Sequence, residues 1–373
     1  WRAEVAAVGH VGALPDPRVS VGYFLESIET RVGPQEARFG VSQTIPWPGG
    51  LSARKRVSSL GAEAAFERLQ SARLALNAQV KRVHFERVLL ERRIELTREN
   101  MELVRYWESV ARARYQVALS AHPDVLRAQV ELGSLENQLA SLEARREPLE
   151  SRMRSLCNLP AAVSLGAPRD TAVNLVEVEL ESITSAALAH NPELAEAERM
   201  IGGADAGVAV ARNAARPDFT VGVDYIQTGP AVNPAMAMFD SGKDPWMIHA
   251  TLSLPLWFGK NAARTREAQA RLRGAEAMRD DRENRLRADI SARVIDYQNA
   301  VRELKLYEGG LIPKAQQSVN ASFAAYQSAK LSFADLLAAQ RQALSFELAL
   351  AEARAAAAIG LAQLEALVGA PLE

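Results

Sequence analysis

Residues 115–129 read YQVALSAHPDVLRAQ, and residues 326–340, 211 positions further on, read YQSAKLSFADLLAAQ. The same offset continues without a gap to Leu156 and Pro160, which match Leu367 and Pro371. Earlier in the chain, residues 13–23 (ALPDPRVSVGY) return as residues 215–225 (ARPDFTVGVDY), and residues 45–50 (IPWPGG) face residues 254–259 (LPLWFG). A repeat of this length predicts a chain built from two copies of one structural unit.

The composition favours long helices. Aromatic residues make up 6% of the 373 residues, while Ala, Leu, Arg, Glu and Gln dominate long stretches. The net charge is −1 with both signs mixed, and no basic stripe with interleaved aromatic residues suggests nucleic-acid binding. Cys157 is the single cysteine, so no internal disulfide is expected, and it fits an oxidising or a reducing compartment. No run of 18 apolar residues predicts a transmembrane helix.

The chain opens at Trp1, inside a segment that reads as a helix. In the second copy, Pro192 lies 25 residues before Pro217, and the equivalent of Pro192 in the first copy would lie about ten residues before Trp1. We therefore expect the first helix to start upstream of Trp1, where a signal sequence or a lipid-anchoring cysteine would also be placed.

Each copy begins with a helical tail, residues 1–13 and 192–215, that ends at a proline. Alternating segments follow, in which Val19, Val21 and Tyr23 lie opposite Ser20 and Gly22. This period of two predicts strands over residues 17–28, 36–46, 217–229 and 246–256. Their length suits membrane-spanning barrel strands, and half-buried strands of a soluble sheet are the alternative.

A long helix is predicted after each strand pair. Roughly 65 residues after Gly50 contain no proline, which corresponds to a helix on the order of 100 Å long. The second copy contains Pro313 after a glycine pair, so we predict an interruption near residues 309–313, whereas Glu102 occupies the matching position in an unbroken first helix. Each helix turns near residues 117–124 or 328–335 and returns as a helix of about 35 residues.

The apolar spacing on the returning helices suits a stripe packed against a neighbouring helix, so hairpins of this length must pack in a larger assembly. Four strands cannot close a barrel, and open sheet edges are not viable in lipid. If the strands enter a membrane, the chain must therefore be a homo-oligomer, with eight strands from two copies or twelve from three.

These motifs, in this order and in both copies, resemble those of the TolC family of outer-membrane efflux proteins. The resemblance covers essentially the whole chain, and it is carried by residues 191–194 (NPEL), 217–218 (PD), 252–259 (LSLPLWFG), 325–326 (AY), Ser332 and 335–340 (DLLAAQ). Residues 43–50 (QTIPWPGG) resemble the corresponding strand end of the heavy-metal cation-efflux branch.

The resemblance implies an α+β fold with long antiparallel helical hairpins, and a homotrimer with a twelve-stranded barrel in the outer membrane and a helical tunnel in the periplasm. Residues 1–162 and 191–373 would be the two structural repeats, with an equatorial linker at 163–190. The implied function is the passive exit duct of a tripartite pump, with an inner-membrane transporter and a periplasmic adaptor as partners. No catalysis, cofactor or nucleic-acid binding is expected.

The resemblance also implies site residues. Asp124 and Asp335 would line the closed periplasmic entrance, where a ring of carboxylates selects for cations; helix N-capping is the alternative role. The tip residues that would contact the adaptor are Ala118, Leu119, Ser120, Ala329, Lys330, Leu331 and Ser332. The family usually has glycine three residues after the tip tyrosine, where this chain has Ala118 and Ala329, so we expect a differently shaped turn.

No other motif indicates chemistry. The histidines are scattered without the spacing of a metal site, and no nucleophile elbow, phosphate-binding glycine loop or carboxylate pair is evident. Met236, Met238 and Met247 lie around an expected external loop, and we interpret them as loop or rim residues although thioethers suit soft cations. A coiled-coil scaffold of the cell envelope is the alternative function. An adaptor is disfavoured because adaptors carry one hairpin. The cargo remains open between metal cations and organic drugs.

Overall fold

The computed structural model describes residues 1–117, 121–169, 175–232 and 239–372. The chain forms two compact units. The first comprises residues 1–69 and 193–282, and the second residues 70–192 and 283–373. Each unit therefore draws on both halves of the sequence.

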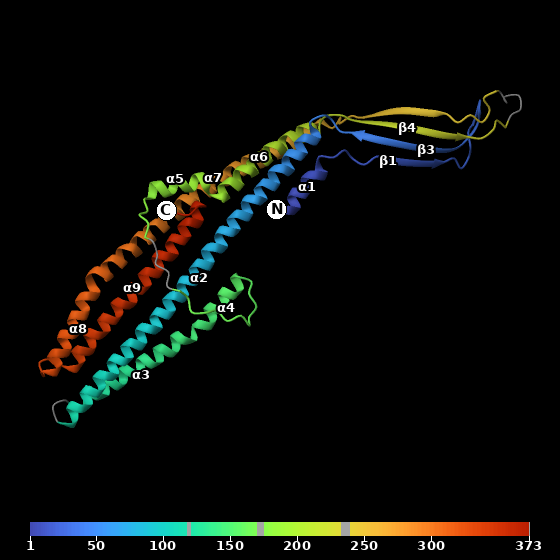
Figure 1. Ribbon diagram of the computed structural model, residues 1–373. Helices are drawn as coiled ribbons and strands as arrows, with labels where there is room; N and C mark the ends of the chain where they lie inside the picture. Colours follow the sequence, from blue (N-terminus) through green and yellow to red (C-terminus); the bar gives the residue numbers. More distant parts are fainter. Residues whose placement is uncertain (118–120, 170–174, 233–238, 373) are drawn as a thin grey trace. The chain divides into compact units, whose positions relative to one another are not determined.

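The first unit contains an antiparallel sheet in the order β1-β3-β4-β5, with β2 paired to the start of β3 (Figure 1). Its elements are α1 (Arg2–Val11), β1 (Arg18–Tyr23), β2 (Glu29–Thr30), β3 (Gly33–Ile45), α6 (Pro192–Asn213), β4 (Asp218–Thr228) and β5 (Trp246–Ser253). It also contains residues 50–69 of α2 (Gly50–Gln116) and residues 258–282 of α7 (Phe258–Leu306). All four predicted strands are present.

The first predicted strand was too long. β1 ends at Tyr23, because the chain then turns into the unpredicted short strand β2, which pairs with Gly33 and Pro34 of β3. This tight turn depends on Gly33, whose φ of +134° is unfavourable for other residues. A Cβ atom at Gly33 would also lie 1.8 Å from the carbonyl oxygen of Gly229.

The register separates the sheet into an apolar and a polar face. One row across the strands is Val21, Phe39, Tyr225 and Trp246, and the neighbouring row is Ser20, Gly40, Asp224 and Met247. The apolar side chains are largely uncovered, with Val21 70% and Ile248 79% exposed. The predicted alternation is thus confirmed, and the apolar face is largely exposed, although Trp47 stacks on Phe219 at one end of it (6.3 Å between ring centroids).

The second unit consists of antiparallel helical hairpins (Figure 1). Its elements are the remainder of α2 and α7, then α3 (His122–Ala144), α4 (Arg146–Leu156), α5 (Leu180–His190), the π-helix η2 (Tyr307–Leu311), α8 (Ile312–Gln327) and α9 (Phe333–Val368). α9 is a single returning helix of 36 residues, whereas its counterpart divides at Arg145 into α3 and α4. The division has a cause that the sequence contained, because Pro148 has no N–H to donate to the carbonyl of Ala144.

The interruption predicted in the second long helix is confirmed. η2 separates α7 from α8, while α2 continues unbroken for 67 residues. Pro313 cannot donate a hydrogen bond to the carbonyl of Gly309, so regular α-helical bonding fails at this point. The wider π turn carries the helix across the gap.

The linker between the hairpins is held against α7. The Tyr297 hydroxyl accepts a hydrogen bond from the Val176 N–H (3.0 Å) and donates one to the Val176 carbonyl (2.9 Å). Gln298 donates to the carbonyl of Val178 (2.9 Å). Burial raises the pKa of Tyr297, so this hydroxyl keeps its proton.

A hydrophobic cluster ties the ends of both hairpins together. It takes side chains from four helices: Trp107, Ala111, Val125, Ala128, Ala315, Val319, Tyr326, Phe333, Leu336, Leu337 and Ala343. Its neighbour, formed by Leu96, Met101, Val104, Leu135 and Leu344, continues the core along the helices. Among the described residues, no helix combines the length and the hydropathy needed to span a bilayer.

Candidate functional site

The tip turn of the second hairpin is a Schellman motif. Lys330 N–H donates to the Ala325 carbonyl (2.8 Å) and Ala329 N–H to the Tyr326 carbonyl (3.0 Å), which satisfies the free carbonyls at the end of α8. Ala329 has φ +58°, the left-handed conformation that glycine favours. Although Ala329 stands where the family usually has glycine, the turn keeps the left-handed backbone conformation that glycine favours.

We expect Ala329→Gly to stabilise the tip turn by about 1 kcal/mol, because the Cβ atom in the left-handed conformation is lost. Amide hydrogen exchange around residues 325–333 should slow by roughly fivefold. The matched control is Ala325→Gly in the last turns of α8, where glycine should instead destabilise the helix by ~1 kcal/mol. Faster exchange in Ala329→Gly would show that alanine carries no strain there.

Asp335 occupies the third position of α9, and Ser332 is the N-cap. The Ser332 hydroxyl accepts from the Asp335 N–H (3.2 Å) and donates to the Asp335 carboxylate (2.6 Å). Ser332 and Asp335 thus have the spacing of a capping box, although the carboxylate accepts from the Ser332 hydroxyl and not from its backbone N–H. The carboxylate lies at the positive end of the helix dipole. Asp335, Ser332, Ala329 and Lys330 are exposed, and Leu331 is half-buried.

Asp124 occupies the same position at the start of α3. The N-cap is Ala121, which offers no side-chain hydrogen bond, and Pro123 fills the first turn. Arg127 Nη1 lies 3.3 Å from the Asp124 carboxylate, whose side chain is 17% exposed. Neither aspartate is therefore the N-cap residue itself, which corrects the simple capping alternative. The predicted tip residues Ala118, Leu119 and Ser120 lie outside the described residues.

Polar contacts between the hairpins lie close to these aspartates. The Arg114 guanidinium stacks over the Tyr326 ring at 5.2 Å and donates to the Gln327 carbonyl. Further from the tip, Arg341 forms an ion pair with the buried carboxylate of Glu131. The hydrogen bond to this carboxylate raises the pKa of Arg341. The two tips are thus joined by charged contacts as well as by the hydrophobic cluster.

A buried amide pair also joins the hairpins, since Gln340 Nε2 donates to Asn100 Oδ1 at 2.8 Å. Neither this pair nor the Glu131–Arg341 pair was predicted from the sequence. The available signal was polar: Asn100 and Glu131 stand within otherwise apolar helical stripes, where a polar residue needs a partner.

A second polar cluster lies on the polar face of the sheet. Asp224 is 1% exposed, with Arg38 Nη2 2.5 Å and His249 Nδ1 3.0 Å from its carboxylate. Gly40 makes room for it, because a Cβ atom there would lie 2.2 Å from Asp224 Oδ1. The described residues contain no group of three or more His, Cys, Asp or Glu that would hold a metal ion.

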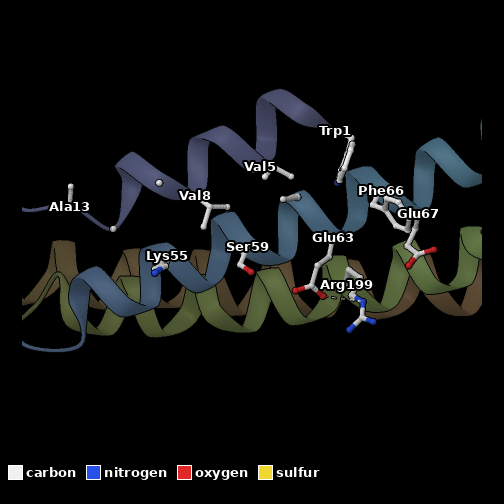
Figure 2. Close-up of a pocket in the computed structure, with 13 residues that line it drawn as sticks. Trp1, Val5, Val8, Ala13, Lys55, Ser59, Glu63, Phe66, Glu67 and Arg199 are labelled. Atoms are coloured by element: carbon white, nitrogen blue, oxygen red, sulfur yellow. Dashed lines mark ion pairs between the residues drawn. The ribbon is translucent and has the colours of Figure 1, made fainter.

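A groove of about 630 Å³ lies between α1, α2 and α6 in the first unit (Figure 2). Its walls include Trp1, whose ring centroid is 5.6 Å from that of Phe66, and the ion pair between Glu63 and Arg199 (3.3 Å). Lys55 lies near one end of it (Figure 2). No motif in the sequence pointed to this groove.

The helical hairpins and the sheet with one uncovered apolar face are the architecture of an outer-membrane channel chain. The family model for the outer membrane efflux protein matches residues 4–158 and 183–370, and this chain belongs to that family. It is accordingly an outer-membrane channel of a tripartite efflux system, with its helical part in the periplasm. These findings confirm the resemblance drawn from the sequence, and nothing supports the scaffold alternative.

Solved structures share this fold. A membrane protein from Pseudomonas aeruginosa aligns with a TM-score of 0.82 and 18% identity over 99% of this chain and 85% of its own. CusC, whose structures concern folding and transmembrane channel formation, gives 0.81 and 14% identity over 99% and 87%. The outer membrane protein VceC of Vibrio cholerae gives 0.78 and 17% over 100% and 90%. No curated protein matches the sequence.

Proposed function

We propose that three copies of this chain form the channel, each supplying β1, β3, β4 and β5 to a closed barrel of twelve strands. Two observations support this assembly. β1 and β5 are the edges of the four-strand path, and an edge strand in lipid needs a partner. The apolar face of the sheet is also exposed along its length, as expected of a lipid-facing surface.

Spin labels test the barrel. We expect labels at Val21 and Val223 to collide with oxygen dissolved in lipid, and labels at Ser20 and Thr220 to collide with a water-soluble nickel chelate. The reason is the alternation seen in the register, which places the two pairs on opposite faces. Contact with water at all four positions in reconstituted vesicles would rule out a membrane barrel.

The helical hairpins then form the periplasmic tunnel. The proposed division into repeats 1–162 and 191–373, with a linker at 163–190, rests on the sequence repeat and on the paired arrangement of α2/α3 and α8/α9. In this scheme the duct is passive, and substrates are delivered by an inner-membrane transporter through a periplasmic adaptor. The family's role in tripartite pumps supports these partners.

Asp124 and Asp335 are the proposed entrance residues, and their support is positional. Both lie in the first turn after a hairpin tip, and three copies would bring six carboxylates to one opening. The proposed adaptor contact comprises Ala118, Leu119, Ser120, Ala329, Lys330, Leu331 and Ser332. An adaptor cross-linked through a photoreactive residue at Lys330, but not at Lys305 on α7, would support it; equal labelling would count against it.

For the cargo, the likeness of residues 43–50 to the heavy-metal branch favours metal cations. The test is deletion of the gene in its host, followed by measurement of resistance to copper, silver, cobalt and zinc and to organic drugs. Loss of drug resistance alone would overturn the metal assignment while leaving the efflux function intact.

A further inference from the structure

Three segments of the first unit meet where the sheet passes into the helices. Residues 47–62, 206–217 and 254–266 contain eight basic residues and no acidic one: Arg54, Lys55, Arg56, Arg212, Arg216, Lys260, Arg264 and Arg266. We call this set the basic junction. All eight are exposed. None of them forms an ion pair with any residue in the described part of the chain, although most arginines on the helices elsewhere do.

Contacts show that the segments meet at one place. Asn213 at the end of α6 donates to the Gly49 carbonyl at the start of α2 (3.4 Å). Trp47 N–H donates to Asp218 (3.1 Å), and the Arg216 guanidinium lies 5.4 Å from the centre of the Trp47 ring. The third segment follows β5, whose Ser253 pairs with Asp218.

Large apolar side chains adjoin these charges. Leu254, Leu256, Trp257 and Phe258 are between 58% and 78% exposed, and they separate the end of β5 from Lys260. Arg264 and Arg266 follow Trp257 by seven and nine residues, and Arg54 and Arg56 follow Trp47 by the same intervals. The connection from β3 to α2 and the connection from β5 to α7 thus each carry a tryptophan, then glycine, and then two basic residues at the same spacing.

This order of side chains matches the chemistry of a lipid leaflet. Aromatic rings settle at the level of the headgroups, and basic residues just beyond them attract anionic headgroups. The helices of this outer-membrane channel lie in the periplasm, so the junction faces the periplasmic leaflet. At the other end of the sheet the balance is reversed, since Glu26, Glu29, Glu36, Asp240 and Asp244 outnumber Arg31 and Lys243.

We propose that the basic junction, together with Leu256, Trp257 and Phe258, is a binding surface for anionic phospholipids of the periplasmic leaflet. The proposal rests on the barrel proposed above, because only strands crossing the membrane bring the junction to the headgroups. The apolar side chains insert beside the acyl chains, and the guanidinium and ammonium groups bind the phosphates. None of these cations forms an ion pair with a described residue, although Asp218 and Glu267 directly follow two of the segments, so the cations are available for lipid.

The test uses the full chain reconstituted in vesicles of brominated phosphatidylglycerol or brominated phosphatidylcholine. Quenching of Trp257 is obtained as the difference between the wild-type protein and Trp257→Phe. We expect the wild-type protein to prefer phosphatidylglycerol. In the triple variant Lys260→Gln, Arg264→Gln, Arg266→Gln this preference should fall at least about fivefold, because even one basic residue near an anionic membrane surface contributes about 1 kcal/mol. High salt should reduce it in the wild type.

The matched control removes three unpaired basic residues of the second unit, Arg302→Gln, Lys305→Gln and Lys314→Gln, and should keep the preference. An equal preference in the wild type and in the junction variant would overturn the proposal, as would a Trp257 that neither lipid quenches. Trp246 on β5 separates this failure from failure of the barrel. If Trp246 is quenched and Trp257 is not, the barrel stands and the junction faces protein; if neither is quenched, the barrel itself is wrong.

Discussion

Changing Asp124 and Asp335 together to asparagine should weaken the block of the channel by trivalent cations at least about tenfold and raise its permeability to anions. Two unit charges 4 Å apart in water interact by about 1 kcal/mol, and a tenfold change in binding corresponds to about 1.4 kcal/mol. A trivalent ion that contacts one carboxylate from each of two copies therefore loses more than the roughly 1.4 kcal/mol of binding free energy that a tenfold change requires. Single-channel recording in planar bilayers measures both quantities.

The variant should still fold. Loss of the carboxylate at Asp335 removes the acceptor of the Ser332 hydroxyl and a negative charge at the start of α9, while Ser332 keeps its acceptor for the helix N–H. The cost therefore stays within about 0.5–2 kcal/mol. A control with the same change of charge, Asp289→Asn with Asp296→Asn on α7, should leave the block unchanged. If the block and the ion preference of the entrance variant equal those of the wild type, the two aspartates serve only their helix ends.

The largest loss of stability is expected from Leu336→Ala. Leu336 is completely buried in the cluster that joins α2, α3, α8 and α9. Removing three carbons from such a site costs about 2–5 kcal/mol, because the lost burial and the remaining cavity add together. We expect the tips of both hairpins to become sensitive to protease at temperatures where the wild-type protein resists.

Leu126→Ala is the matched control, since Leu126 also lies in the first turns of a returning helix but is 47% exposed. Its loss should cost less than about 1 kcal/mol. Thermal denaturation in detergent and timed proteolysis distinguish the two variants. Equal losses of stability would mean that the hairpin tips are held by their polar contacts and not by the hydrophobic cluster.

Most helices and strands could be predicted from the sequence, because each of the sequence signals for them is local. Alternation over residues 217–229 and 246–256 comes from the geometry of a strand, and Pro313 interrupts a helix whatever surrounds it. The cap of α9 was predictable too, since Ser332 and Asp335 have the spacing of a capping box. The break at Arg145 was equally predictable, because Pro148 obeys the same rule as Pro313.

The side-chain partners of the buried polar residues could not be predicted from the sequence. Arg341 and Glu131 are separated by 210 residues, and Gln340 and Asn100 by 240. Nothing local determines which helix faces bring such residues together, because the pairing depends on how two hairpins rotate about their axes. The same limit applies to Asp224, whose burial beneath Arg38 and His249 requires the register of three strands at once.

The π-helix between α7 and α8 accounts for a change in the residue offset between the two sequence copies. Where the helices begin, the copies match at an offset of 209, since residues 45–50 face residues 254–259. At the hairpin tips the offset is 211, since Tyr115 matches Tyr326. The second copy therefore holds two additional residues between these points, and each would turn every later side chain by about 100° around a regular helix. We infer that the wide turn at 307–311 absorbs one of them, so that deleting Gly309 or Gly310 should convert this turn to ordinary helix and leave the tip facing as it does now.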